Sequence, residues 1–288
     1  MQGEVHDLAT EAIQEGAATF DIVPPRGWFD LDLRELWASR ELLWFLVWRD
    51  LKVRYKQTAI GVGWVVIQPV ATMLIFSVFF GRLARMPSDG LPYPVFYYCA
   101  LLPWTYFATA LTNATQTIIE HERVITKVYF PRVLLPMSAV LSGLIDVAVS
   151  MVILVGMMLY YHLAPKPTAL LAPLFLLLAI ATALGVGLAL SALNAIYRDV
   201  RHAMPFLIQF WMFASPVAYP SSLVPAHWRW LYGLNPMAGV IEGFRWALTG
   251  HGQPPSGFLF VSAFCVLLSL VGGLLYFKKM EGAMSDRI

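Results

Sequence analysis

The sequence contains few groups of side chains whose types and spacing could support chemistry. Glu120-His121-Glu122 combines residue types that bind metal ions, but consecutive residues do not share a helix face, which favours a solvated loop. The 6 histidines lie far apart, and Cys99 and Cys265 both stand in apolar runs, without the spacing of a disulfide framework or a metal site. We therefore predict no metal site in this chain.

Motifs for nucleotide binding and hydrolysis are absent from the sequence. It contains no Gly-x-x-x-x-Gly-Lys-Ser/Thr, no His-Glu-x-x-His and no Gly-x-Ser-x-Gly. The chain therefore does not hold ATP in a P-loop. A catalytic centre within a membrane would bring several polar groups together, and the apolar runs are nearly empty of ionisable residues.

Two ionisable features remain. Asp146 lies deep in an apolar run, where a carboxylate is costly unless it faces the protein interior or water. It could serve a proton path or a polar channel wall, or it could be protonated or bound by a Ser or Thr of a neighbouring helix. Glu242 and Arg245 stand three residues apart, a spacing at which they can pair on a helix.

The composition indicates that these residues are positioned by a membrane protein with several spans. Hydrophobic residues make up 58% of the 288 residues and charged residues only 13%, whereas a soluble domain carries about 25% charge. The net charge of +2 is too small for a partner recognised through its phosphates. These values exclude an ordinary soluble enzyme, a disordered chain and a nucleic-acid binder.

Six runs are long and apolar enough to cross a bilayer as helices, which takes about 20 residues each. The predicted fold class is therefore an all-α membrane protein with six transmembrane helices. Pro103 predicts a kink in the second run, and Pro205 and Pro216 predict a broken or tilted fifth run. The six runs are 60–82, 93–117, 134–161, 168–196, 203–220 and 257–277.

The basic residues predict the orientation. With the N-terminus in the cytoplasm, fifteen of the 20 Lys and Arg residues fall on the cytoplasmic side, which is the bias that membrane proteins show. Both termini are therefore expected in the cytoplasm. Residues 1–29 are acidic and lack the apolar core of a signal peptide, so we expect a cytoplasmic tail there and a second one over 281–288.

Residues 30–57 are expected to form an amphipathic helix in the membrane interface. Tryptophans beside basic residues are typical of such helices. The helix could only anchor the chain, or it could also form part of a docking surface for a cytoplasmic partner. The residues expected to share one apolar face are Leu33, Trp37, Trp44, Trp48, Leu51 and Tyr55.

The loop 117–133 is longer than a simple connection needs. It mixes charged residues with exposed apolar ones, a combination typical of a protein contact, although a short helix lying on lipid would show the same pattern. The residues expected to make the contact are Glu120, Glu122, Arg123, Val124, Lys127, Val128, Tyr129 and Phe130.

The segment 221–255 is expected to form a re-entrant or surface hairpin on the outer side. Asn235 and Pro236 predict a helix start, as N-cap and first helical residue, and Gly250 predicts its end. The helix between them would be roughly 20 Å long, too short to cross. The residues expected at the membrane surface are Trp228, Trp230 and Tyr232.

Aromatic residues form 14% of the sequence. Most aromatic side chains in membrane proteins serve packing or lie at the interface. Their rings can also stack on the apolar faces of sugars, so a lumen lined by them would let a glycan slide. The candidates for such a lining are Trp64, Tyr97, Tyr98, Trp104, Tyr106, Phe107 and Phe210.

Four stretches, taken in order, resemble the permease subunits of ABC-2-type polysaccharide exporters, which carry O-antigen, capsule and teichoic acid. The resemblance covers about 30–280 and leaves out the N-terminal tail. The stretches are 44–69 (WFLVWRDLKVRYKQTAIGVGWVVIQP), 122–136 (ERVITKVYFPRVLLP), 194–202 (NAIYRDVRH) and 234–245 (LNPMAGVIEGFR).

The resemblance implies a permease subunit that is not itself an enzyme. Two copies of a six-span domain over 58–280 would form a channel in the bacterial inner membrane, above two separate ATP-binding subunits that bind the ATP and Mg. The chain itself would hold no cofactor. The substrate would be a glycan on undecaprenyl diphosphate, moved to the outer side of the membrane.

The resemblance also implies roles for particular segments. The loop 117–133 would be the coupling helix that docks on the ATP-binding subunit, with Arg198 as a lesser contact. The hairpin 221–255 would be the periplasmic gate, carrying Trp228, Trp230, Glu242 and Arg245. The cations at the cytoplasmic entrance, which could meet the diphosphate or merely anchor the helix, are Arg49, Lys52, Arg54 and Lys56.

Three alternatives stay open beside polysaccharide export. The first is an ABC-2 exporter of a lipid or drug, which the aromatic content and the four stretches disfavour. The second is a membrane enzyme acting on lipid-linked sugars, which needs a cluster of acids or histidines that is not visible. The third is an ion-coupled carrier, which needs pairs of acidic residues within the spans.

Overall fold

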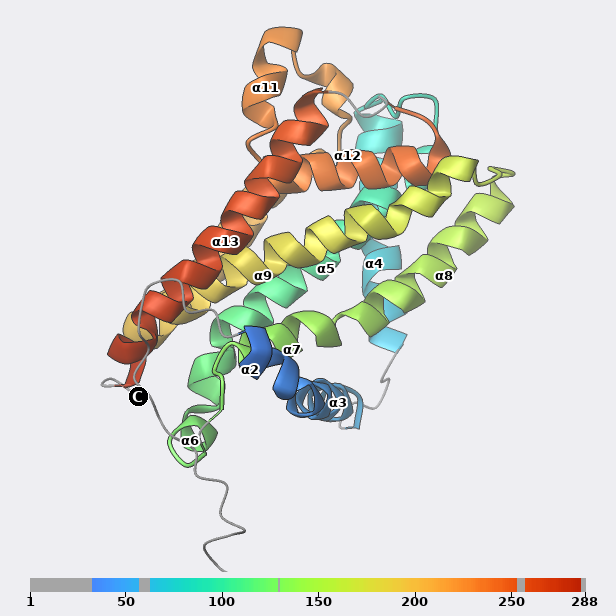
Figure 1. Cartoon of the computed structure of the whole chain (residues 1–288). Helices are drawn as coiled ribbons and strands as arrows, with labels where there is room; N and C mark the ends of the chain where they lie inside the picture. Colours follow the sequence, from blue (N-terminus) through green and yellow to red (C-terminus); the bar gives the residue numbers. More distant parts are fainter. Residues whose placement is uncertain (1–32, 57–62, 129, 253–256, 286–288) are drawn as a thin grey trace, which may run out of the picture. The chain divides into compact units, whose positions relative to one another are not determined.

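The computed structural model describes residues 33–56, 63–128, 130–252 and 257–285, and within these ranges the chain is built from helices without strands (Figure 1). The expected tail over 1–29 lies outside the described residues. Four segments are long and apolar enough to cross a bilayer, namely Gly63–Leu83, Leu134–Tyr160, Pro167–Ile196 and Gly257–Met284. They correspond to the first, third, fourth and sixth expected runs.

Each of these segments has its own helical construction. The first is α4 (Gly63–Phe76) followed by a π-helical stretch η1 (Ser77–Leu83), and the second is α7 (Leu134–Ser142) followed by α8 (Leu144–Tyr160). The third joins a 3-10 turn η2 (Pro167–Leu171) to α9 (Ala172–Ile196). The last is the single helix α13 (Gly257–Ser285).

The second and fifth expected runs fold differently. Helix α5 (Tyr93–Glu120) has 28 residues and continues through Pro103, so the expected kink does not end the helix. Helix α10 (Val200–Phe213) has only 14 residues, about 20 Å, and the rest of the expected run 203–220 is not helical. The cause is Pro216, because a proline disfavours the helical conformation of the residue before it.

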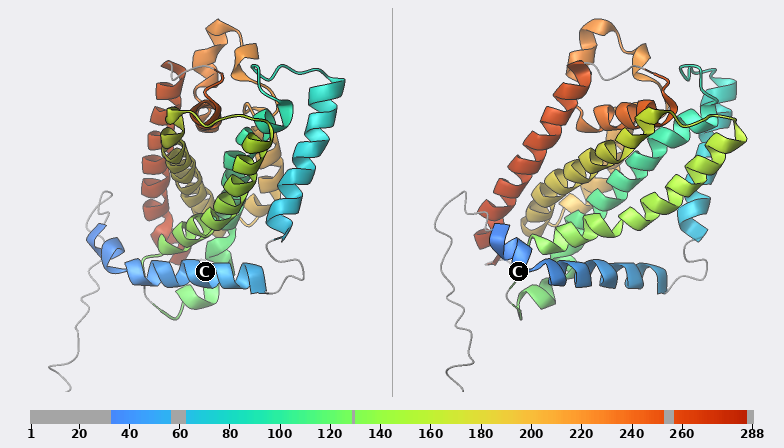
Figure 2. Two further views of the ribbon diagram at one scale, coloured as in Figure 1. Left: turned by 90° about the vertical axis from the view of Figure 1, so that its right-hand side faces the viewer. Right: turned by 45° about the vertical axis from the view of Figure 1, so that its right-hand side comes forward.

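The helices define two ends of the bundle, which we name by the short helices found there. At the α6 end, α2 (Leu33–Ala38) and α3 (Arg40–Lys56) lie across the bundle beside α6 (Glu122–Ile125) (Figures 1 and 2). At the α11 end, η3 (Ser221–Leu223), η4 (Ala226–Trp228) and α11 (Arg229–Tyr232) form a hairpin that precedes α12 (Pro236–Thr249).

The bundle has two apolar clusters. The larger one surrounds α5 and extends to α12, and the smaller one lies at the α6 end. The smaller cluster joins Leu46 of α3, Ile118 of α5 and Phe277 and Met284 of α13. Helix α13 continues to Ser285 and buries Met284, so the described part of the expected tail, residues 281–285, is helical.

Helices α9 and α13 pack closely along their lengths (Figures 1 and 2). A Cβ atom on Gly273 would overlap the carbonyl oxygen of Gly185, and one on Gly185 would lie 2.5 Å from the carbonyl oxygen of Ser269. Small residues let helix backbones approach in this way inside membranes. The pair α9–α13 therefore forms a tight support that reaches from one end of the bundle to the other.

The interface helix differs from its expected amphipathic form. It is divided at Ser39 into α2 and α3, and α3 has apolar residues on both sides. Trp44 and Trp48 are exposed, whereas Leu51, expected on the same face, is buried against the bundle. The spacing predicts one apolar face. In the structure, part of that face is exposed and part is buried against the bundle.

Candidate functional site

Helix α6, within the predicted contact loop, lies at the outer edge of the α6 end (Figure 1). Helix α5 ends at Glu120, His121 is its C-cap, and α6 adds one further turn. Residues 120–128, which we call the α6 segment, expose Val124 and Val128 between charged side chains. Apolar groups rimmed by charge are suited to a protein contact.

The predicted contact residues do not all share this exposure. Glu120, Arg123 and Lys127 are exposed, and Glu122 is half-buried. Phe130 packs in part against the smaller apolar cluster, so it faces its own chain as well as the outside. Tyr129 lies outside the described residues.

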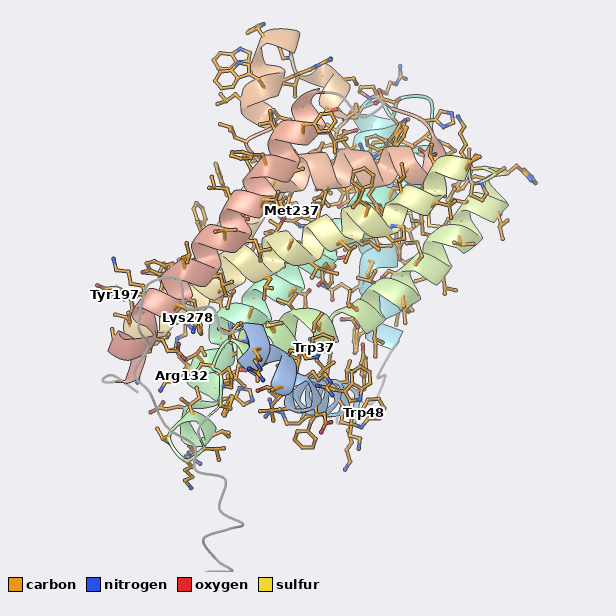
Figure 3. The ribbon with its side chains drawn as sticks, viewed as in Figure 1. Trp37, Trp48, Arg132, Tyr197, Met237 and Lys278 are labelled. Atoms are coloured by element: carbon orange, nitrogen blue, oxygen red, sulfur yellow. The ribbon has the colours of Figure 1, made fainter. Side chains whose placement is uncertain are left out.

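One further contact and an exposed loop lie at the same end of the bundle as the α6 segment. The Arg132 guanidinium donates to the Glu281 carbonyl at 3.1 Å, which ties the end of the loop to α13. Figure 3 labels Arg132 with Tyr197 and Lys278 at this end. Arg198 is exposed between α9 and α10, beside the exposed ring of Tyr197.

The four predicted entrance cations all lie on α3 and fall into two groups. Arg49 binds Asp50 at 2.8 Å and Arg54 binds Asp146 at 2.7 Å. Lys52 is exposed, with its Nζ 5.5 Å from the ring centre of Trp48, and Lys56 is also exposed. Arg49 and Arg54 are thus paired with carboxylates, whereas Lys52 and Lys56 are more exposed.

Asp146 has a different environment from the one expected. The helical structure is interrupted at Gly143, between α7 and α8. This interruption places Asp146 in the first turn of α8. Its carboxylate accepts hydrogen bonds from Arg54 and from the Tyr55 hydroxyl. Burial and the neighbouring Asp146 raise the pKa of Tyr55 to about 12. Asp146 is therefore bound to two side chains of α3, Arg54 and Tyr55.

Most of the aromatic candidates are buried inside one chain. The Tyr106 hydroxyl, for example, donates to the Val140 carbonyl at 3.1 Å. Only Trp64 on α4 and Phe210 on α10 are exposed. The candidates that pack in the core of the single chain are Tyr97, Tyr98, Trp104, Tyr106 and Phe107.

Two further aromatic residues, which were not among the lining candidates, lie beside Phe210. Phe206 and Phe213 are also exposed on α10, and the spacing of three to four residues places all three on neighbouring positions of the helix. That spacing was the available signal. It was hard to use because the run was expected to extend to residue 220.

Helix α12 has the predicted ends. The Asn235 side chain accepts from the Met237 amide at 3.0 Å, Pro236 is the first helical residue, and Gly250 has φ = +64°. The predicted pair also forms, with Arg245 Nη1 3.0 Å from Glu242 Oε1. Glu242 and Arg245 are both buried, at 5% and 1% exposure.

The buried pair holds the non-helical chain that follows α10. Arg245 donates to the Pro216 carbonyl at 2.7 Å, and Glu242 accepts from the Ser221 amide at 2.9 Å. The guanidinium also lies 3.8 Å from the ring centre of Phe96 on α5, a cation–π distance. Asn235 adds a bond to the Ala214 carbonyl at 3.0 Å.

The hairpin before α12 is exposed, by contrast. Trp228 and Trp230 lie open to the surroundings at the α11 end. Beneath the hairpin lies a cavity of about 690 Å³, bordered by α5, α9 and α10. Its polar lining groups, Asn235 and Tyr232, are already hydrogen-bonded, so the cavity is apolar. Across the described residues, no group of three His, Cys, Asp or Glu side chains is placed to hold a metal ion.

Comparison with known proteins places the chain among transporters. The O-antigen export system permease protein RfbA of Myxococcus xanthus is 30% identical over 224 residues, which cover 77% of this chain and 85% of that protein. A protein of the same name from Klebsiella pneumoniae is 27% identical over 84% of this chain and 92% of its own length. The polysialic acid transport protein KpsM of Escherichia coli is 23% identical over 83% of this chain and 93% of its own length.

The family comparison covers most of the helices described above. The ABC-2 type transporter family matches residues 41–249, from the first turn of α3 to the last residue of α12. The four apolar segments agree with a multi-pass membrane protein. The match extends over more than half of the chain, and the chain therefore belongs to the ABC-2 type transporter family.

Proposed function

We propose that this chain is the membrane-spanning subunit of an ATP-driven exporter of a lipid-linked, O-antigen-like polysaccharide. One observation carries the proposal. The chain belongs to the ABC-2 family and has no P-loop motif, and its relatives are named for O-antigen export and polysialic acid transport. In this proposal the α6 end faces the cytoplasm of a bacterium, both termini lie there, and the membrane is the inner one. The substrate is a glycan on undecaprenyl diphosphate.

The working transporter in this proposal contains two copies of the chain and two ATP-binding subunits, which supply ATP and Mg. The exposed helices support a dimer. Only 6% of the most apolar stretch of Gly63–Leu83 is buried, and α10 exposes three phenylalanines. Lipid can cover part of this surface, and a second copy the rest. Together with α5 and the short α10, the four apolar segments would make six spans.

The α6 segment is the proposed docking site for the ATP-binding subunit. Its exposed valines and charged residues support this role, and Arg198 at the same end would add a lesser contact. The residues proposed to touch the ATP-binding subunit are Glu120, Glu122, Arg123, Val124 and Lys127.

The channel wall is proposed to lie on α4 and α10. Trp64 and Phe210 remain candidates, and Phe206 and Phe213 join them because they are exposed on the same helix. The aromatic side chains of α5 support the wall from behind. At the entrance, Lys52 and Lys56 are proposed to meet the diphosphate, since both are exposed.

The gate is proposed to consist of a fixed part and a moving part. Glu242 and Arg245 belong to the fixed part, because they are buried and hydrogen-bonded to backbone groups. The hairpin carrying Trp228 and Trp230 is the moving part, and the apolar cavity beneath it leaves room for movement.

Export of a lipid or a drug is a second candidate function. The apolar cavity of about 690 Å³ favours it, because its volume and lining suit a hydrocarbon chain or a small hydrophobic molecule.

The test is reconstitution of this chain with ATP-binding subunits of its own genome. We expect a complex with two copies of each chain, whose ATPase activity changes when lipid-linked glycan is added. A complex that responds to drugs or free lipids, and not to the glycan, would support the second candidate. A chain that recruits no ATP-binding subunit would overturn both.

A matched pair of variants tests the docking site in the same preparation. Arg123→Glu should weaken the complex with the ATP-binding subunit, because it reverses a charge on the exposed α6 segment. Arg82→Glu reverses an exposed charge on η1, at the opposite end, and should leave assembly unchanged. Equal assembly by the two variants would contradict the docking assignment.

A further inference from the structure

Helix α3 is joined to three other helical segments by side chains. Arg49 lies 2.6 Å from His121 at the end of α5, and Asp50 accepts from Ser138 of α7 at 3.1 Å. Arg54 donates to Asp146 of α8 at 2.7 Å. The partners stand 72 to 92 residues away along the chain, so α3 connects parts of the fold that the chain order separates.

The His121 contact brings α3 next to the α6 segment. The Nδ1 atom of His121 lies 2.9 Å from the Thr117 carbonyl oxygen, which can only accept a hydrogen bond. Nδ1 must therefore be the donor, which leaves Nε2 to accept from Arg49. Glu122, the next residue, begins α6. His121, the residue directly before α6, therefore contacts Arg49 of α3. A displacement of α6 would reach α3 through this residue.

Apolar packing and charged side chains hold α3 to its neighbours at different positions. Leu46, Val47 and Leu51 are buried against the bundle, so α3 is attached to its neighbours by apolar contacts. The Arg54–Asp146 pair is about a quarter exposed, and ion pairs that water reaches contribute little to stability. The pair instead joins the end of α3 to the first turn of α8. This part of α8 would therefore follow a displacement of α3.

We propose that α3 transmits displacement of the α6 segment to α8, with Arg49, Asp50, Arg54, His121 and Asp146 as positioning residues. This inference rests on the proposed function, since it takes the α6 segment as the docking site of an ATP-binding subunit. Arg49 and Arg54 hold the helices in register, and the cargo diphosphate is left to the exposed lysines.

The test replaces the ion pair by a covalent link that can be removed. In a Cys265→Ala background, Arg54→Cys and Asp146→Cys are combined, and the complex with the ATP-binding subunit is reconstituted. The native Cys99 is buried and can stay. We expect ATP hydrolysis to continue while the amount of glycan exported per ATP falls by about 2- to 30-fold.

Joining the two cysteines with a reducible bis-thiol reagent should restore export per ATP, and reduction should abolish it again. Arg54→Lys keeps the ion pair and should retain most of the ratio. Glu41→Gln changes an exposed residue of the same helix and serves as the matched control.

Two results would overturn the inference. One is a double cysteine variant that exports as much glycan per ATP as the control. The other is a parallel loss of assembly, ATP hydrolysis and export, which indicates a purely structural pair. Failure of the unmodified chain to bind any ATP-binding subunit would instead count against the proposed function.

Discussion

Two of the ion pairs in the described part of the chain, one near each end of the bundle, lie in opposite surroundings. The side chains of Arg245 and Glu242 near the α11 end are 1% and 6% exposed. Those of Arg54 and Asp146 at the α6 end are 28% and 25% exposed. Removing one partner of a buried pair leaves an uncompensated charge, whereas water stabilises the remaining partner of an exposed pair.

The two pairs also bind different kinds of partner. Arg245 and Glu242 bond to backbone groups of Pro216 and Ser221, so they fix the path of a non-helical segment. Arg54 and Asp146 bond to each other across two helices, through flexible side chains. The first arrangement resists change, and the second can follow small movements of its helices.

The largest expected effect is on the buried pair. Arg245→Ala should lower the free energy of unfolding by about 3–5 kcal/mol, because Glu242 would be left buried without its cation. Unfolding in detergent, followed by tryptophan fluorescence, measures the difference. A loss no greater than that of Arg54→Ala would remove the contrast between the two ends.

The second prediction concerns the support between the two ends. Gly273→Ala should destabilise the protein by about 1–3 kcal/mol, since its Cβ atom would overlap the Gly185 backbone of α9. Gly272→Ala is the matched control, because a Cβ atom there meets nothing within 4 Å. If the two variants unfold alike, α9 and α13 do not pack as closely as described.

The third prediction concerns the exposed pair. Arg54→Ala should cost at most about 1 kcal/mol of unfolding free energy, and the cost should shrink in high salt because the pair is screened. Denaturant unfolding at low and high salt measures both values. A loss as large as that of Arg245→Ala, or one insensitive to salt, would show that water does not reach the pair.

The smallest effect is on the titration of Tyr55. Its pKa is raised to about 12, so its neutral form is favoured in the folded protein. The stability that this provides is complete below about pH 10, the unfolded value, and is lost as the pH rises toward 12. Tyr55→Phe should remove one late step from the ultraviolet titration of tyrosines. An unchanged curve near pH 12 would contradict the contact with Asp146.

Features that depend on near neighbours in the chain were predictable. The start of α12 at Asn235 and Pro236, its end at Gly250 and the pairing of Glu242 with Arg245 all agree with the structure. Four of the six apolar runs agree for the same reason, because a long apolar run forms a helix that can cross a membrane whatever surrounds it.

The tertiary structure alone decided which faces of these helices are covered. The sequence could not separate the buried Tyr97 from the exposed Phe210, because both are aromatic residues in apolar runs and only packing distinguishes them. It could not find a partner for Asp146, since Arg54 stands 92 residues away. Composition and spacing determined that this is a helical membrane protein whose sequence contains no P-loop motif. Contacts across many residues decided how its charges are paired, because a pair's partner depends on which helices meet.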